Sequence, residues 1–121
     1  GRLFAAFLSN EEQKSLLKSF SSLPRKPKIG DAELDKTEFI DELSNIAEAR
    51  MATGLGDFQS NVCSYSVPIL NARGEIEFAL TVIGYESDIG NPEDKASKRI
   101  KKELISSMER LTEKLGTWSS I

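Results

Sequence analysis

The stretch Ser60–Tyr85 constrains the fold of this 121-residue chain more than any other part. Two β-rich runs flank Asn71-Ala72-Arg73-Gly74, which is typical turn chemistry because glycine supplies a positive φ angle. We therefore expect a β-hairpin with these residues as its loop, in which Leu70 faces Glu75. The expected pairs are Val62–Ile83, Ser64–Thr81 and Ser66–Ala79 on one face, and Cys63–Val82, Tyr65–Leu80 and Val67–Phe78 on the other.

The two faces of this hairpin differ in chemistry. One is apolar and is expected to pack in the core; it includes Val67, Phe78, Leu80 and Val82. The other is small and partly hydroxylated, and carries Ser64, Ser66, Ala79 and Thr81. A one-residue slip would mix the two sets, which favours this register. The hydroxyl-bearing face is a candidate floor for a ligand pocket, although its hydroxyls could instead pair with each other across the strands.

Two helices are predicted in the first part of the chain, one from its apolar residues and one from a capping pattern. The apolar segment Gly1–Leu8 is expected to be helical, and Leu3 and Phe4 belong to its apolar face. Nothing precedes this helix to cap it, so we interpret it as part of a longer chain. Ser9 and Glu12 form a capping-box pattern, which predicts a second helix beginning there.

The segment Ser21–Gly30 contains two prolines, a serine pair and a glycine, which predicts a loop. Its basic residues Arg25, Lys26 and Lys28 allow two interpretations, a phosphate-binding cluster or a solvated loop. The absence of aromatic neighbours favours the solvated loop.

A third helix is expected over Leu34–Arg50. Asp35 and Glu38 form a second capping box, and Leu34 with Phe39 forms the hydrophobic staple around it. The apolar residues that recur at helical spacing are Phe39, Ile40, Leu43, Ile46 and Ala47.

The rest of the chain is divided by its glycines and proline. Met51–Gly56 is expected to be a turn, or a short strand followed by a turn, and Asp88–Gly90 a loop. Asn91-Pro92 predicts the cap and first position of a last helix, and Leu115-Gly116 predicts its end. A two-stranded hairpin is too small a sheet for four helices. Further strands must come from Met51–Gly54, from an absent N-terminal segment, which we favour, or from a second copy.

Composition excludes several kinds of site. The chain has no histidine, so the commonest general base and metal ligand is absent. A single cysteine, Cys63, excludes an internal disulfide and multi-cysteine metal patterns, and a lone thiol is typical of the cytoplasm. We expect no metal, no cofactor and no membrane span. A net charge of −3 argues against non-specific nucleic-acid binding by this segment.

The ordered set of motifs resembles the effector-binding domain of IclR-type bacterial transcriptional regulators. The opening GRLFAAFLSNEEQKSLL is similar to a helical segment of that domain, and Arg50-Met51-Ala52 to the end of a later helix. Val67–Glu75 and Phe78–Tyr85 are similar to its strand–turn–strand segment, and Leu115-Gly116 to its close.

This resemblance implies a GAF-like α/β (α+β) domain, an antiparallel sheet with flanking helices, that binds a small organic or aromatic acid. It also implies a winged helix-turn-helix domain, absent from this chain, through which such regulators bind DNA as dimers or dimers of dimers. Residues 1–121 would then be the C-terminal part of the effector-binding domain of a homodimer or homotetramer.

The resemblance also implies effector contacts at five positions, which are Gly54, Val62, Ser64, Thr81 and Ile83. The four strand positions lie on the hydroxyl-bearing face of the predicted hairpin. Gly54 offers no side-chain hydrogen bond and Ile83 replaces a usual hydroxyl. We therefore expect a more apolar effector than a small oxo-acid, with Met51–Gly56 and Asp57 at the pocket rim.

Two other functions are open from the residues. An enzyme would have to use carboxylates, lysine or Cys63, and the register places Cys63 on the core face, which indicates an inert buried thiol. A non-catalytic dimerisation or scaffold module would have its space above Ser64 and Thr81 filled by side chains.

Overall fold

A computed structural model describes the chain at residues 2–29, 32–55 and 59–119. Its helices are α1 (Arg2–Ala6), α2 (Asn10–Lys18), the 3-10 turn η1 (Phe20–Ser22), α3 (Lys36–Ala49), α4 (Glu86–Ile89) and α5 (Lys95–Ser119). Its strands are β1 (Lys28–Ile29), β2 (Ala32–Glu33), β3 (Ala52–Leu55), β4 (Val62–Leu70) and β5 (Ile76–Tyr85). Within these described ranges, no helix is both long and apolar enough to cross a bilayer.

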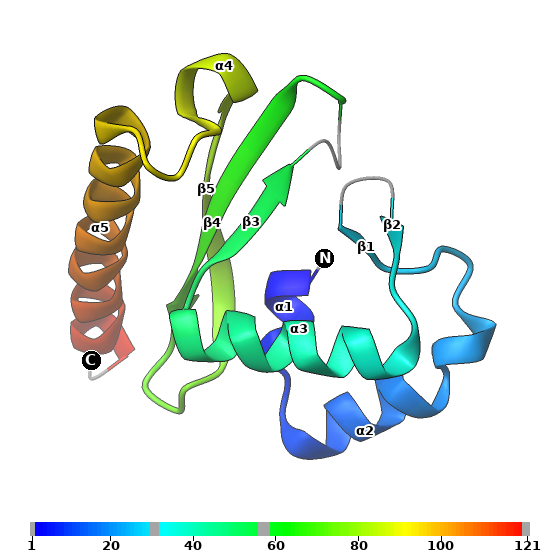
Figure 1. Cartoon of the computed structure of the whole chain (residues 1–121). Helices are drawn as coiled ribbons and strands as arrows, with labels where there is room; N and C mark the ends of the chain where they lie inside the picture. Colours follow the sequence, from blue (N-terminus) through cyan, green and yellow to red (C-terminus); the bar gives the residue numbers. More distant parts are fainter. Residues whose placement is uncertain (1, 30–31, 56–58, 120–121) are drawn as a thin grey trace.

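Helices cover an antiparallel sheet on both faces. The sheet has the order β3-β4-β5, and β1 pairs with β2 in a separate small ladder. Figure 1 shows α5 on one side of the sheet, and α1, α3 and α2 on the other. The predicted mixture of helices and antiparallel sheet is therefore confirmed, and β3 supplies the short strand that was one of the expected alternatives.

The alternation of side chains along β4 separates two hydrophobic clusters. The cluster between the sheet and α5 contains Cys63, Tyr65, Val67, Ile69, Ile89, Leu104 and Met108. The cluster on the other side of the sheet joins α1, η1 and α3, and includes Leu3, Phe20, Phe39, Leu43 and Ile46. The sheet is thus anchored to helices on both sides, and the pocket described below lies on the α1 side.

The register of the hairpin differs from the prediction by two residues. Ser64 pairs with Ile83 and Ser66 with Thr81, so the expected pair Ser64–Thr81 is wrong. Leu70 pairs with Ile76 rather than with Glu75, so the connection between the strands is one residue longer than expected. Within it, Asn71 donates its N–H to the carbonyl of Glu75 at 2.9 Å. An irregularity between Ile69 and Leu70 adds the second residue. Because side chains alternate with period two, this even shift leaves the two predicted faces unchanged.

The apolar face is less completely covered than predicted. Phe78, expected in the core, is 57% exposed near the start of β5, whereas Val67 is fully buried. Pro68 lies where the pairing of β3 with β4 has already ended at Ser66, so its missing N–H leaves no neighbouring strand unsatisfied.

Both predicted helix caps in the first half of the chain are present. Asp35 accepts from the Glu38 N–H at 2.8 Å, and the Glu38 carboxylate accepts from the Asp35 N–H at 3.2 Å. At the other cap Ser9 accepts from the Glu12 N–H at 3.2 Å, while its hydroxyl donates to the Glu12 carboxylate. These contacts explain why α2 and α3 begin directly after the predicted cap residues, Ser9 and Asp35, although the third helix was expected from Leu34.

Several other boundaries are corrected. The first helix ends at Ala6 rather than at Leu8, and its buried residues are Leu3, Ala5 and Ala6, whereas Phe4 is 42% exposed. The expected loop Asp88–Gly90 mostly belongs to α4. The last helix begins at Lys95 rather than after Asn91, because the Asp94 N–H donates to the Asn91 carbonyl and residues 91–94 form a separate turn. It also continues past Leu115-Gly116 to Ser119.

Candidate ligand-binding site

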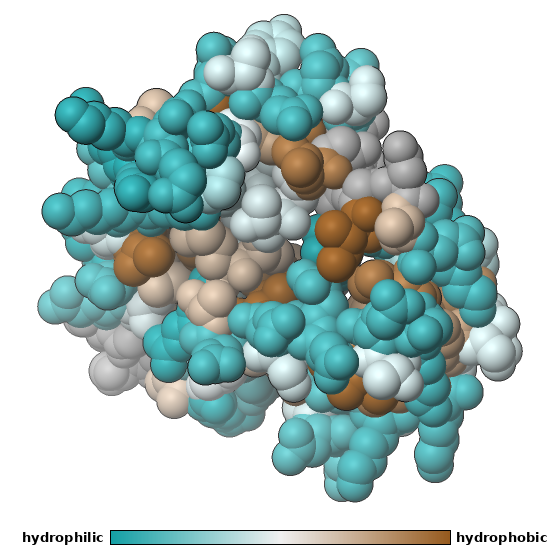
Figure 2. Space-filling model, in the orientation of Figure 1, coloured by the Kyte–Doolittle hydropathy of each residue, from teal (hydrophilic) through white to brown (hydrophobic). Residues whose placement is uncertain are grey.

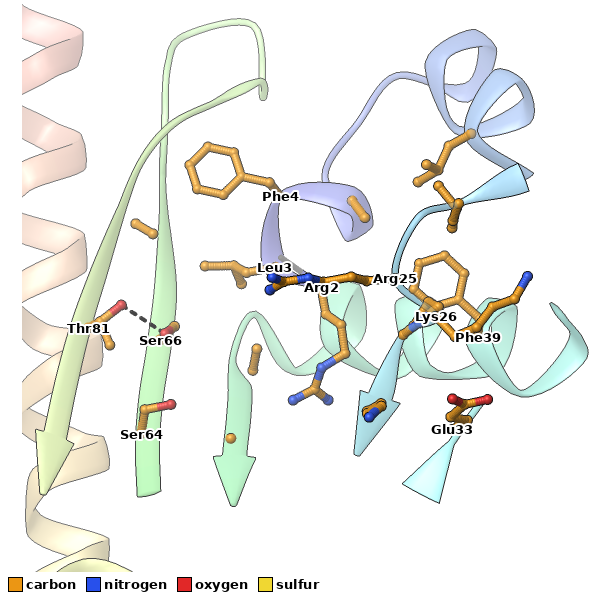
Figure 3. A pocket seen from close by; sticks show the side chains of 18 of the residues that line it. Arg2, Leu3, Phe4, Arg25, Lys26, Glu33, Phe39, Ser64, Ser66 and Thr81 are labelled. Atoms are coloured by element: carbon orange, nitrogen blue, oxygen red, sulfur yellow. Dashed lines mark hydrogen bonds between the residues drawn. The ribbon is translucent and has the colours of Figure 1, made fainter. Parts of the chain in front are cut away.

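A cavity of about 1130 Å³ lies between the sheet and the segment 23–28. Its sheet wall is formed by β3, β4 and β5, and α1 and α3 contribute apolar side chains (Figure 3). Figure 2 shows apolar side chains between hydrophilic ones near the middle of the visible face. The volume is at or above the upper end of the ~300–1,000 Å³ that small-molecule sites occupy. The cavity is therefore large enough for a metabolite with an apolar body.

Three of the five predicted contact residues line this cavity. They are Gly54 on β3, Ser64 on β4 and Thr81 on β5. Val62 and Ile83 lie on the same face of the sheet but do not line the cavity, and Ile83 is 65% exposed. The cavity therefore extends from Ser64 toward the hairpin loop rather than toward Ile83. The expected rim residue Asp57 lies outside the described residues.

The hydroxyl groups on the sheet wall have different partners. Ser66 and Thr81 share a hydrogen bond of 2.8 Å across the strands, as drawn in Figure 3. The hydroxyl of Ser64, a residue that lies opposite Ile83, has no hydrogen-bond partner among the described residues. Ser64 and Ser66 are half-buried, whereas Thr81 is exposed, so the cavity opens to solvent along β5. The Ser64 hydroxyl is thus the sheet-wall hydroxyl that is open to an external partner.

The wall opposite the sheet is basic. The sequence favoured a solvated loop for this segment and did not predict that it lines the pocket. Arg25, Lys26 and Lys28 all line the cavity, together with Arg2 from α1. Glu33 is the acidic residue among the described lining residues. The sequence did contain the basic cluster, but it did not show where the loop lies relative to the sheet.

Two of these four cations already have partners within the protein. Arg2 forms an ion pair of 2.9 Å with Glu42, and it also donates to the carbonyl of Thr53. Lys26 donates to the carbonyl of Phe20 at 3.0 Å, and its ammonium lies 4.9 Å from the centre of the Phe20 ring. These contacts hold α1 and the loop in place.

The side chains of Arg25 and Lys28 have no ion-pair or hydrogen-bond partner among the described residues. Figure 3 shows Arg2 and Arg25 lying between the strand that carries Ser64 and Ser66 and the segment that carries Lys26. The cavity therefore has uncommitted positive charge on one wall and an uncommitted hydroxyl on the other.

Cys63 faces away from this cavity. Its side chain is 2% exposed in the cluster between the sheet and α5, as the sequence predicted. Burial raises the pKa of the Cys63 thiol, and the negative charge of Glu86 adds to the rise. A protonated, enclosed thiol is a poor nucleophile, so Cys63 contributes no chemistry to the pocket.

The fold is similar to that of solved bacterial transcriptional regulators. The Thermotoga maritima IclR superposes with a TM-score of 0.77 and 20% identity, over 95% of this chain and 44% of that one. An IclR transcriptional regulator from Alicyclobacillus acidocaldarius gives 0.75 and 19%, over 95% of this chain and 43% of that one.

A third neighbour is the inducer-binding domain of the Acinetobacter transcription factor PobR, solved as a double mutant with 3-hydroxybenzoic acid. Its TM-score is 0.72 at 16% identity, over 92% of this chain and 61% of that one. The chain thus spans less than two thirds of the length of these neighbours. No protein-family model matches the sequence, and no curated protein matches it. The structural neighbours agree with the resemblance to IclR-type regulators, and at this identity the likeness concerns the fold.

Proposed function

We propose that this chain is part of the effector-binding domain of a transcriptional regulator, and that its ligand is a small organic or aromatic acid. The main support for this proposal is the cavity on the hydroxyl-bearing face of the sheet, in a fold shared with the inducer-binding domain of PobR. The cavity is not filled by side chains, whereas a scaffold module would have a filled space there. The apolar residues Leu3, Phe4 and Phe39 among its lining favour a ligand with an apolar body.

In this proposal the chain does not bind DNA itself. A winged helix-turn-helix domain in another part of the protein binds the operator, in the cytoplasm, as a homodimer or homotetramer. The effector acts by binding one arrangement of the regulator more tightly than the other, which shifts the equilibrium between them. A ligand with equal affinity for both arrangements would have no effect on DNA binding.

Ligand binding can be tested by calorimetry and thermal shift with a panel of aromatic and aliphatic acids, including 3-hydroxybenzoate, on the full-length protein. Ala79 lines the cavity, whereas Ala72 lies in the hairpin loop away from it, and both are exposed. We expect Ala79→Phe to weaken binding at least tenfold by filling the cavity, and Ala72→Phe to leave it unchanged. If no acid of the panel binds the wild type, or if both variants bind equally well, the proposed pocket is wrong.

A further inference from the structure

The acidic group of a ligand in this cavity has two candidate anchors, the hydroxyls of the sheet wall and the cations of the segment 24–28. The family resemblance implied effector contacts at Ser64 and Thr81, whose hydroxyls can donate to a carboxylate or keto oxygen. In the structure Thr81 is hydrogen-bonded to Ser66, which commits part of the hydrogen-bonding capacity of both hydroxyls. A neutral hydroxyl also binds a carboxylate less strongly than a guanidinium or ammonium does.

The segment that carries these cations is held in place at the cavity. The Leu34 N–H donates to the Pro27 carbonyl at 2.8 Å, and Lys26 donates to the Phe20 carbonyl. The β1–β2 ladder, in which Lys28 lies opposite Glu33, fixes the end of the segment. These contacts hold the backbone of residues 26–28 at the cavity, while the side chains of Arg25 and Lys28 are left without partners among the described residues.

From this placement we infer that the effector binds lengthwise across the cavity. Its acidic group docks on Arg25 and Lys28, and a neutral polar group at its other end bonds the Ser64 hydroxyl. Phe4 lines the space between these walls and is 42% exposed, so it is available to contact an apolar middle section. The ligand class is thus an apolar or aromatic acid with a hydroxyl or carbonyl group remote from the acid. This inference rests on the proposed function and specifies how the same cavity is used.

Three related probes separate the two ends of the ligand. 3-(4-Hydroxyphenyl)propionate has both groups, 3-phenylpropionate has only the acid, and 4-(3-hydroxypropyl)phenol replaces the acid by an alcohol. Calorimetry on the full-length protein measures the dissociation constant of each probe. We expect the first probe to bind most tightly, and added salt to weaken the two acids more than the alcohol because it screens their charge.

The variants assign each end to a wall. We expect Arg25→Gln with Lys28→Gln to weaken both acids about tenfold to hundredfold and to leave the alcohol unchanged. Lys95→Gln with Lys102→Gln removes the same charge from exposed positions of α5, where neither residue lines the cavity, and should change nothing. Ser64→Ala should weaken the phenol-bearing probes about two- to tenfold and spare 3-phenylpropionate.

The outcomes distinguish this inference from the function on which it rests. If none of the three probes and no acid of the wider panel binds the wild type, the proposed function fails and the inference fails with it. If the acids bind, but the Arg25/Lys28 double variant behaves like the Lys95/Lys102 control, the ligand is held elsewhere and only the inference fails. The inference would also be wrong if Ser64→Ala by itself abolished binding of both acids.

Discussion

The hydroxyl of Tyr65 is the polar link between the sheet and the two C-terminal helices. It donates to the carbonyl of Ile89 in α4 at 2.6 Å, and it lies 3.0 Å from the hydroxyl of Ser97 in α5. Tyr65 is 2% exposed and Ser97 is fully buried. Because Tyr65, Ser97 and Ile89 are all buried, replacing Tyr65 by phenylalanine leaves the Ile89 carbonyl without that donor.

The magnitude follows from these contacts. A net hydrogen bond contributes about 0.5–1.5 kcal/mol, and a buried group left unsatisfied costs about 1–3 kcal/mol. We expect Tyr65→Phe to lower the free energy of unfolding by about 2 kcal/mol. Ser97→Ala should cost less, about 1 kcal/mol, because the Tyr65 hydroxyl can still donate to Ile89. The double variant should cost less than the sum of the two, since both changes remove one shared contact.

Urea unfolding followed by circular dichroism measures this effect, with an unchanged dependence on urea showing that only stability has changed. Tyr85→Phe is the matched control, because Tyr85 is 60% exposed and should lose less than about 0.5 kcal/mol. If Tyr65→Phe is no more costly than Tyr85→Phe, the Tyr65 hydroxyl does not fasten α4 and α5 to the sheet, and the reasoning is refuted.

Two further predictions concern local features. Asp35→Ala should lower the free energy of unfolding by about 1 kcal/mol, because it removes the side-chain acceptor that caps α3. Asp41→Ala, at an exposed position of the same helix, should change the free energy of unfolding little. Equal losses for the two variants in urea unfolding would contradict the cap. Cys63 should react with a thiol reagent in the native protein far more slowly than in the urea-unfolded protein at the same pH, because burial raises the pKa of its thiol. The unfolded thiol ionises first as the pH rises, so this group should reduce stability above the ordinary thiol pKa of about 8.5. Rapid native labelling at neutral pH would contradict the burial of Cys63.

The features that the sequence predicted correctly depend on near neighbours. The two capping patterns act over three residues, so they can be recognised without knowing the tertiary fold. The faces of the hairpin were also predicted correctly. Side chains alternate with period two along a strand, so a register that is wrong by two residues still assigns each side chain to the correct face. The cross-strand partners were predicted wrongly, because Ser66 rather than Ser64 is hydrogen-bonded to Thr81.

Where the sequence predicted a boundary wrongly, the local residue pattern is compatible with more than one backbone structure. Asn91 before a proline is a good helix cap, but an asparagine that accepts from the N–H two residues later also closes a turn. In the structure the Lys98 N–H donates to the carbonyl of Asp94, so the first turn of α5 begins later. Likewise, the apolar pattern of β5 predicted which face Phe78 occupies, but it could not show whether α5 extends far enough to cover it.

The basic wall of the cavity shows why the site itself was only half predictable. The Ser64 side depends on the alternation within one strand, which the sequence contains directly. The Arg25 side depends on where a loop is anchored, and that anchoring comes from the Leu34 N–H on Pro27 and from Lys26 on Phe20. A proline-rich basic segment without such anchors would be solvated, as its composition suggests. The same residues held over a hydroxyl-bearing sheet become one wall of a cavity, so their interpretation changes with tertiary contacts although their sequence does not.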